Sequence, residues 1–133
     1  MTRILIVDDD AGITLAFKTG LEADEFKVDT FNDPLEALSN FKASMYDLLL
    51  LDVRMPKMNG FELYKELEKI DSHVKVCFIT AFEVYYEALR EVFPSLEVEC
   101  FIRKPIEIAS LIKMIKNQIN VSKPSSQSQN LDK

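Results

Sequence analysis

Hydrophobic positions along the chain follow two alternating periods. Five short runs are mainly apolar, and each has the length of a single strand. They are Ile4–Val7, Val28–Phe31, Leu48–Leu51, Val76–Ile79 and Val98–Ile102. Apolar runs without regular polar alternation are typical of parallel strands that are buried on both faces. The pattern therefore predicts five parallel strands.

Stretches with helical spacing lie between these runs, with apolar residues recurring at intervals of three and four. A further helix is expected to begin at Asp33–Glu36, with Asp33 as the N-cap and Pro34 in the first turn. Alternating strands and helices predict an α/β fold, a doubly wound five-stranded parallel sheet with five flanking helices. The other apolar helical positions are Ile13, Ala16, Phe17 and Leu21; Leu63, Leu67 and Ile70; Tyr85, Ala88, Leu89 and Val92; and Ile108, Leu111, Ile112, Ile115 and Ile119.

The chain of 133 residues has the length of one domain. The periodic pattern stops after Ile119, and a Ser/Gln-rich polar stretch follows. We expect one domain over residues 1–120, and a disordered tail or the start of a linker over residues 121–133.

Charge and composition exclude several classes of function. The net charge of −6 argues against direct binding of nucleic acid or of an anionic membrane by this domain. No apolar segment approaches the roughly 20 residues of a membrane span, and the N-terminus does not resemble a secretory signal. Cys77 and Cys100 both lie in apolar runs, so two reduced, buried thiols and a cytoplasmic location are expected.

The third predicted strand ends in an unusual way. Four leucines run directly into Asp52, and the turn-forming residues Pro56, Asn59 and Gly60 follow. A carboxylate resists burial more than almost any other group. We interpret the leucine run as a buried strand that holds the Asp52 carboxylate in a fixed position.

Other polar side chains follow the remaining strands at the same end. They are Asp8–Asp10 after the first strand, Thr80 at the end of the fourth and Lys104 after the fifth. In open α/β sheets, ligands bind at the carboxyl ends of the strands. We therefore expect these groups to form one site with Asp52.

The residue types in this site suit phosphoryl transfer. Clustered carboxylates bind a hard divalent cation such as Mg²⁺ (or Mn²⁺) through oxygen atoms. The carboxylate of Asp52 can attack a phosphoryl group and hold it as an acyl phosphate. Lys104 follows a strand two positions from that of Asp52, about 10 Å away, and can place positive charge on the phosphoryl oxygens. Thr80 offers a hydroxyl group to them.

These motifs resemble the response-regulator receiver domains of two-component signalling. The resemblance rests on "ILIVDDD", "LLLLDVRMPKMNG", "FITA" and "FIRKP", in this order, and extends to Ile119. It implies a flavodoxin-like strand order of 2-1-3-4-5. It also implies a cytoplasmic phosphoprotein that forms an aspartyl phosphate, with self-catalysed phosphorylation and autodephosphorylation but no enzymatic turnover of a free substrate.

The resemblance also implies a role for each site residue. Asp52 is the expected phospho-acceptor, and the metal ligands are Asp8, Asp9, Asp52 and the backbone carbonyl of Arg54. Thr80 and Lys104 engage the phosphoryl group. Thr80 and Phe101 form the switch, and the Lys104–Pro105 peptide bond is cis.

The family resemblance implies partners as well. The expected donor is a sensor histidine kinase or a phosphotransfer protein of a phosphorelay. The expected recipient of the signal is an output domain or a target protein, which binds the face built from the fourth and fifth strands and the helices that follow them. A phosphorylation-dependent homodimer is a further expectation.

Two positions depart from the common pattern of the family. Arg54 and Phe82 each lie two residues after a site residue, and the resemblance implies that residues at these positions line the path of the water that hydrolyses the acyl phosphate. A long cation and a bulky ring there predict slow loss of the phosphoryl group. Phe82, Tyr85, Tyr86 and Phe93 also gather near the expected output face.

Two alternatives from other classes stay open on the sequence. A haloacid-dehalogenase-like phosphohydrolase would use Asp8 as the nucleophile and Asp10 as the general acid/base, but Gly12 stands where that family tends to have threonine. A phosphorylation-independent, receiver-like binding module would keep the fold and lose site residues, and none is lost here.

Overall fold

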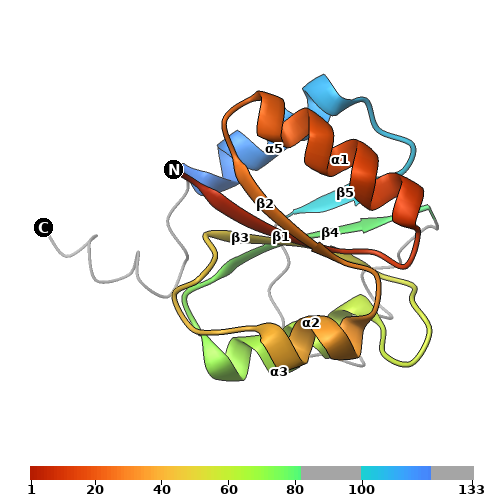
Figure 1. The fold of residues 1–133 in the computed structure, drawn as a ribbon, viewed down its shortest axis with the longest axis vertical. Helices are drawn as coiled ribbons and strands as arrows, with labels where there is room; N and C mark the ends of the chain where they lie inside the picture. The colour runs from red at the N-terminus through yellow and green to blue at the C-terminus, as the bar shows by residue number, and fades with distance from the viewer. Residues whose placement is uncertain (82–99, 121–133) are drawn as a thin grey trace, which may run out of the picture.

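The computed structural model of the chain describes residues 1–81 and 100–120. Within these residues, five parallel strands form one sheet in the order β2-β1-β3-β4-β5 (Figure 1). The strands are β1 (Arg3–Val7), β2 (Lys27–Phe31), β3 (Leu48–Asp52), β4 (Lys75–Thr80) and β5 (Phe101–Arg103). The predicted parallel sheet and its strand order are confirmed. β5 is shorter than predicted at its start and extends one residue further at its end.

Four helices cover the sheet in the described part of the chain. They are α1 (Ala11–Ala23), α2 (Pro34–Asn40), α3 (Gly60–Ile70) and α5 (Ile108–Ile119). Helices α1 and α5 lie on one face of the sheet and α2 and α3 on the other, as a doubly wound fold requires (Figure 1). The predicted helix that contains Tyr85–Val92 and the predicted tail at 121–133 lie outside the described residues.

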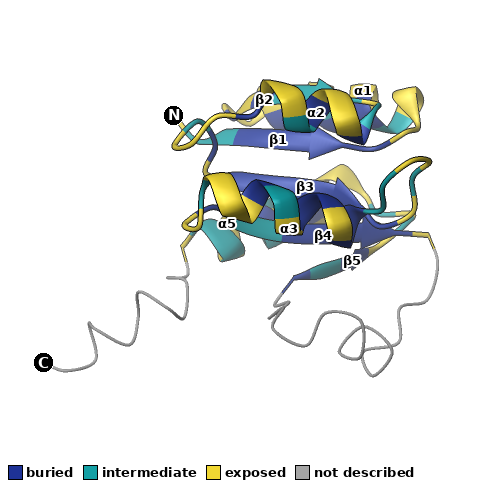
Figure 2. Ribbon diagram, turned by 90° about the horizontal axis from the view of Figure 1, so that it is seen from below, coloured by how far each residue is buried: buried dark blue, intermediate teal, exposed yellow. Residues whose placement is uncertain are grey.

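The core consists of two apolar layers, one on each face of the sheet. Leu49 and Leu51 belong to the layer beneath α2 and α3, and Leu48 and Leu50 belong to the layer beneath α1 and α5. All four leucines are fully buried, which stabilises the fold by about 2 kcal/mol for each side chain. Figure 2 shows the same division, with buried strands between helices that turn exposed residues outward. The uninterrupted leucine run is therefore explained by coverage of both faces.

Side-chain caps start the helices close to the ends of the strands. Asp10 accepts hydrogen bonds from the backbone N–H groups of Gly12 and Ile13 at the start of α1. Asp33 caps α2 through the N–H of Leu35, as predicted. Asn59 and Glu62 form a reciprocal capping box at the start of α3. These caps hold the loops at the carboxyl edge of the sheet in place.

The predicted apolar faces of three helices include exposed residues, and one of these is Ala16 in α1. Ile70, the last residue of α3, is 43% exposed, and Ile108, the first residue of α5, is 37% exposed. Both residues stand at helix ends, where the described residues leave part of the side chain exposed although the periodic pattern continues. Ile108 nevertheless lies directly against Gly20, where an added Cβ atom would collide with its side chain. The close approach of α1 and α5 thus depends on a glycine.

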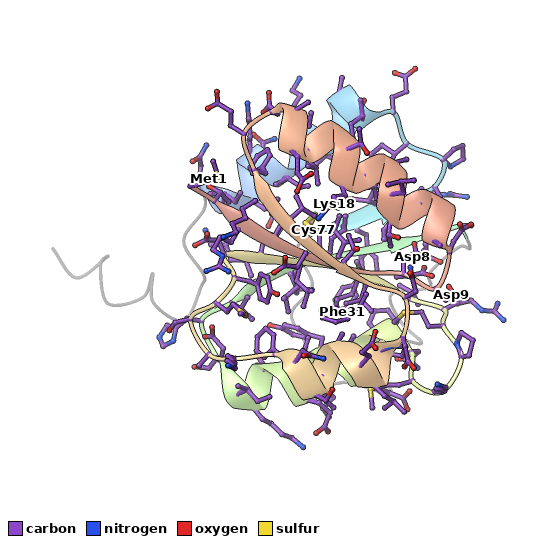
Figure 3. All side chains as sticks on the ribbon, in the orientation of Figure 1. Met1, Asp8, Asp9, Lys18, Phe31 and Cys77 are labelled. Atoms are coloured by element: carbon purple, nitrogen blue, oxygen red, sulfur yellow. A yellow bond between two sulfur atoms is a disulfide. The ribbon has the colours of Figure 1, made fainter. Side chains whose placement is uncertain are left out.

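The prediction of two reduced thiols is wrong, because Cys77 and Cys100 form a disulfide in the structure. Phe78 and Phe101 are in register across β4 and β5, so the two cysteines stand side by side one residue earlier. Their Cα atoms are 4.6 Å apart. The sequence does not reveal this pairing, because it depends on the register between two separate strands. Figure 3 shows Cys77 within the layer of side chains between the sheet and α1.

Gly60 makes the closest backbone approach near the end of β3. Its N–H donates to the carbonyl of Val53, and an added Cβ atom would collide with the carbonyl oxygen of Asp52. Because that neighbour is backbone rather than a flexible side chain, β3 or α3 would have to move. The glycine therefore brings α3 against the strand end that carries Asp52.

We expect Gly60→Ala to lower the free energy of unfolding by about 1–3 kcal/mol, because the clash with the backbone of Asp52 must be relieved by movement. The matched control is Gly12→Ala, whose Cβ would meet only a side-chain oxygen of Asp10, at 3.3 Å. That variant should stay within about 1 kcal/mol of the native protein. Urea unfolding measures both. Equal effects of the two substitutions would contradict the close approach at Gly60.

Candidate functional site

Four site residues predicted from the sequence meet at the carboxyl edge of the sheet. Asp8 follows β1, Asp52 is the last residue of β3, Thr80 is the last residue of β4 and Lys104 follows β5. Figure 3 shows Asp8 and Asp9 where β1 leads into α1. Because the strands are parallel, they end at the same edge of the sheet and bring together residues that are almost a hundred positions apart in sequence.

Asp8 is held in place by bonds on several sides. Its side chain is buried, and Oδ1 accepts a hydrogen bond of 2.9 Å from the N–H of Asp10. Its backbone N–H donates to the carbonyl of Phe31, and its own carbonyl accepts from the side chain of Asn32 at 2.8 Å. Asn32 also donates to the hydroxyl of Thr14 at 3.1 Å. The role of Asn32 was missed from the sequence, where only its position after the second strand marks it.

Lys104 reaches both buried carboxylates. Its Nζ lies 2.7 Å from Asp8 Oδ2 and 3.6 Å from Asp52 Oδ1, and only 14% of its side chain is exposed. The contact with Asp8 is a short ion pair between a cation and a buried carboxylate. One cation therefore faces two buried carboxylates, and Asp9 adds a third carboxylate nearby.

The electrostatics of the site are dominated by Asp52. Burial, and then the charge of Asp8, raise the pKa of Asp52 to about 7, whereas the ammonium group of Lys104 acts in the opposite direction. Burial alone would lower the pKa of Lys104, but its contacts with Asp8 and Asp52 outweigh burial and raise it. In the described part of the chain, three carboxylates and the ammonium group of Lys104 therefore share this site.

The carboxylates of Asp8, Asp9 and Asp52 fit a divalent cation. One oxygen atom of each lies within 4.8 Å of the others. Asp8 and Asp52 are buried and Asp9 is exposed, which leaves the cluster accessible from one side. Asp8 Oδ2 is buried and lies 2.7 Å from the ammonium group of Lys104, and the close grouping of three carboxylates around it is the main sign of such a site. Hard cations with oxygen ligands, such as Mg²⁺, suit this donor set.

Thr80 and Phe101 lie on the neighbouring strands β4 and β5. Thr80 is 2% exposed, and its carbonyl accepts a hydrogen bond of 2.9 Å from the N–H of Lys104. Phe101 is half-buried, and its ring lies 5.8 Å from that of Phe78 and 6.1 Å from that of Phe61. The Lys104–Pro105 peptide bond is cis.

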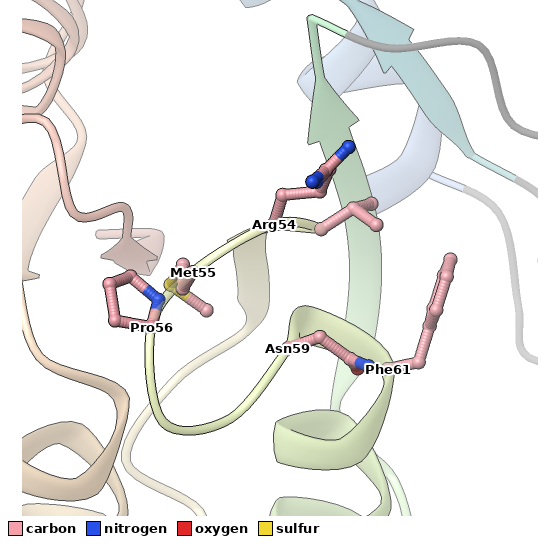
Figure 4. A pocket seen from close by; sticks show the side chains of 6 residues that line it. Arg54, Met55, Pro56, Asn59 and Phe61 are labelled. Carbon is pink, nitrogen blue, oxygen red and sulfur yellow. The ribbon is translucent and has the colours of Figure 1, made fainter.

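A pocket of about 490 Å³ opens beside the site. Figure 4 shows Arg54, Met55 and Pro56 on the loop that follows β3, and Asn59 and Phe61 at the start of α3. Arg54 is exposed. Phe82, the second residue expected to influence hydrolysis, lies outside the described residues.

Comparison with known proteins assigns the family. A model of the response regulator receiver domain matches residues 4–116, and the chain belongs to this family. The non-phosphorylated HemR receiver domain from Leptospira biflexa is 30% identical, with a TM-score of 0.80, over 93% of this chain and 98% of that one. TrrA from Thermotoga maritima, solved in complex with Mg(2+)-BeF, is 30% identical, with a TM-score of 0.75, over 89% of this chain and 99% of that one.

A relative of known sequence adds a second comparison. The transcriptional regulatory protein CpxR homolog of Haemophilus influenzae is 48% identical over 81 residues, which are 61% of this chain and 35% of that protein. The chain spans about a third to a half of the length of the curated relatives that it matches. The part of the chain that the structure describes contains no helix with the length and apolarity to cross a lipid bilayer.

The phosphohydrolase alternative loses its support. It uses Asp10 as a general acid/base, but the described carboxylate cluster consists of Asp8, Asp9 and Asp52, and Asp10 caps the start of α1 instead. The family match and the fold identify the chain instead as a receiver domain with a phosphorylatable aspartate site.

The raised pKa of Asp52 predicts how stability depends on pH without divalent cations. The folded state binds a proton at Asp52 up to about pH 7, whereas the unfolded chain releases it near pH 4. The contribution of Asp52 to the free energy of unfolding should therefore fall as the pH rises between these values. Asp52→Asn should remove this dependence and stabilise the protein by about 1–3 kcal/mol at pH 8. Urea unfolding in the presence of a chelator, at several pH values, measures how the free energy of unfolding changes with pH in the native protein and in the variant. Equal slopes would contradict the raised pKa.

Proposed function

We propose that this domain takes a phosphoryl group from the phosphohistidine of a histidine kinase, or of a phosphotransfer protein, onto Asp52. One observation carries the proposal. The carboxylate of Asp52 ends a fully buried strand within ion-pair distance of Lys104 and beside the carboxylates of Asp8 and Asp9. A nucleophile, a cation and a cluster of oxygen ligands therefore share one edge of the sheet.

The chemistry follows from these positions. An oxygen atom of Asp52 attacks phosphorus, the bond between phosphorus and the histidine nitrogen breaks, and an acyl phosphate forms. The ammonium group of Lys104 offsets the charge that gathers on the phosphoryl oxygens. We assign Asp8, Asp9, Asp52 and the backbone carbonyl of Arg54 as ligands of Mg²⁺ or Mn²⁺. The bound ion would neutralise part of the same charge.

In the proposed switch, phosphorylation at the site changes the face of the domain that includes β4 and β5. A phosphoryl group on Asp52 draws the hydroxyl of Thr80 toward its oxygens, and Phe101 fills the space that Thr80 leaves. The ring of Phe101 packs against those of Phe61 and Phe78 in this structure, and it would leave these neighbours as it turns toward Thr80. The changed face is the one that we assign to an output domain, a target protein or a second copy of the chain.

The domain itself acts in this scheme as a phospho-acceptor and not as an enzyme with a free substrate. The phosphoryl group of a kinase derives from ATP, and we therefore place the domain in the cytoplasm. The output that it controls lies in the remainder of a longer regulator or in a separate protein.

The direct test is incubation with Mg²⁺ and acetyl phosphate, followed by intact mass and peptide mapping. We expect one labile phosphoryl group on Asp52, and none in Asp52→Asn. The matched control is Asp33→Asn, at a half-buried N-cap that asparagine also supports. An adduct on Asp8 would contradict the proposal. So would the absence of any adduct on the native protein together with failure to bind a beryllofluoride mimic.

The lifetime of the acyl phosphate tests the roles of Arg54 and Phe82. Both side chains are expected to obstruct the attacking water, so Arg54→Ala and Phe82→Ala should each speed hydrolysis by about tenfold, equivalent to about 1.4 kcal/mol of barrier. The decay of the adduct after removal of acetyl phosphate measures this rate. Unchanged decay in both variants would show that the side chains point away from the path of the water.

A further inference from the structure

The disulfide between Cys77 and Cys100 has no part in the phosphoryl chemistry. These are the only two cysteines of the chain. Cys77 has no exposed surface and Cys100 is 3% exposed, and both belong to the apolar layer beneath α1 and α5. The bond therefore lies inside the domain and joins β4 to the residue that precedes β5.

The disulfide is continuous with the proposed switch. Phe78 follows Cys77 and Phe101 follows Cys100, and these two phenylalanines are paired in register across β4 and β5. The N–H of Phe78 also donates to the carbonyl of Cys100 at 2.9 Å. Any shift of the Phe101 backbone relative to β4 must therefore act against a covalent bond at the adjoining residue.

The bond also closes a loop around the switch. The two cysteines are separated by 23 positions, and the loop between them contains Thr80. A crosslink of this kind restricts how far the start of β5 can move from β4, because the two Cα atoms stay near their distance of 4.6 Å. Of the two proposed switch residues, Thr80 thus lies inside the covalently closed segment and Phe101 lies at its edge.

We propose that Cys77 and Cys100 form a reversible redox site that restrains the switch, so that the disulfide form responds less to phosphorylation than the dithiol form. This inference rests on the proposed function of Asp52, Thr80 and Phe101. Disulfides in reducing compartments are usually transient and redox-sensing, which fits such a role.

The reaction is thiol–disulfide exchange with a small thiol of the glutathione class. A thiolate attacks one sulfur atom, the bond between the two protein sulfurs breaks, and a mixed disulfide and one protein thiolate form. A second thiol attacks the mixed disulfide, which releases the second protein thiolate and the oxidised small thiol. Both protein thiolates then take up protons, and the protein has gained two electrons.

Thermodynamic linkage makes the restraint measurable from both directions. If the disulfide disfavours the activated state, a phosphoryl mimic must bind the dithiol form more tightly. By the same factor, the mimic must favour reduction of the disulfide. Both sulfur atoms are buried, so a small thiol must wait for β5 to separate from β4 before it can react. The rate of exchange therefore measures that separation.

The first measurement counts thiols. The purified protein is denatured and alkylated without reductant, and its mass is compared with that of a sample treated with dithiothreitol. We expect no alkylation before reduction and two adducts after it. Two adducts without reduction, in protein purified with or without exposure to oxidised glutathione, would overturn the inference.

The second measurement compares affinity for beryllofluoride with Mg²⁺ by isothermal titration calorimetry. Oxidised protein, reduced protein and the Cys77→Ala/Cys100→Ala variant are compared. We expect the reduced protein and the variant to bind at least about fivefold more tightly than the oxidised protein. Thermal unfolding checks that all forms fold, with a midpoint roughly 5–15 °C lower without the crosslink.

The outcomes separate this inference from the proposed function. Equal affinity of all three forms would overturn the redox restraint and leave the phospho-acceptor role intact. Failure of every form to bind beryllofluoride and to accept phosphate from acetyl phosphate would overturn the proposed function, and the redox restraint with it.

Discussion

The mutual repulsion of the buried carboxylates at the end of the sheet is the constraint on which this domain depends. Asp8 and Asp52 are both buried, and the ammonium group of Lys104 lies within ion-pair distance of each of them. Neither carboxylate would remain there by itself, because burial of a charge without a full complement of partners is costly. The raised pKa of Asp52 expresses this cost. A site with excess negative charge and one exposed side is prepared for a cation and for a phosphoryl group.

The rest of the fold supplies the energy and the rigidity that hold these charges together. Two apolar layers fix β1 and β3 side by side, and the leucines of β3 are buried up to the residue that carries the reactive carboxylate. Asn32 and Asp10 then fix Asp8 from the loop side, and Gly60 lets α3 approach the carbonyl of Asp52. Apolar burial thus stabilises the strands, whereas the costly burial of carboxylates lies at their ends.

Much of this arrangement could be predicted from the sequence, because periodicity reports burial directly. The apolar runs predicted the strands, and the residues at their ends predicted the cluster of Asp8, Asp52 and Lys104. Interactions that depend on register or on close backbone approach could not be predicted in this way. The disulfide of Cys77 with Cys100 is one example, and the contact of Gly60 with Asp52 is another. The exposure of Ile70 was missed because apolar spacing alone does not show where the end of a helix loses contact with the core.

The central claim is that these carboxylates form one cation site whose repulsion the fold tolerates. Thermal unfolding during a titration with Mg²⁺ tests it most directly, with Asp8→Asn and Asp52→Asn measured beside the native protein. The account predicts that Mg²⁺ raises the unfolding temperature of the native protein and has a much smaller effect on each variant. An unfolding temperature that Mg²⁺ leaves unchanged in the native protein, or raises equally in all three proteins, would contradict it.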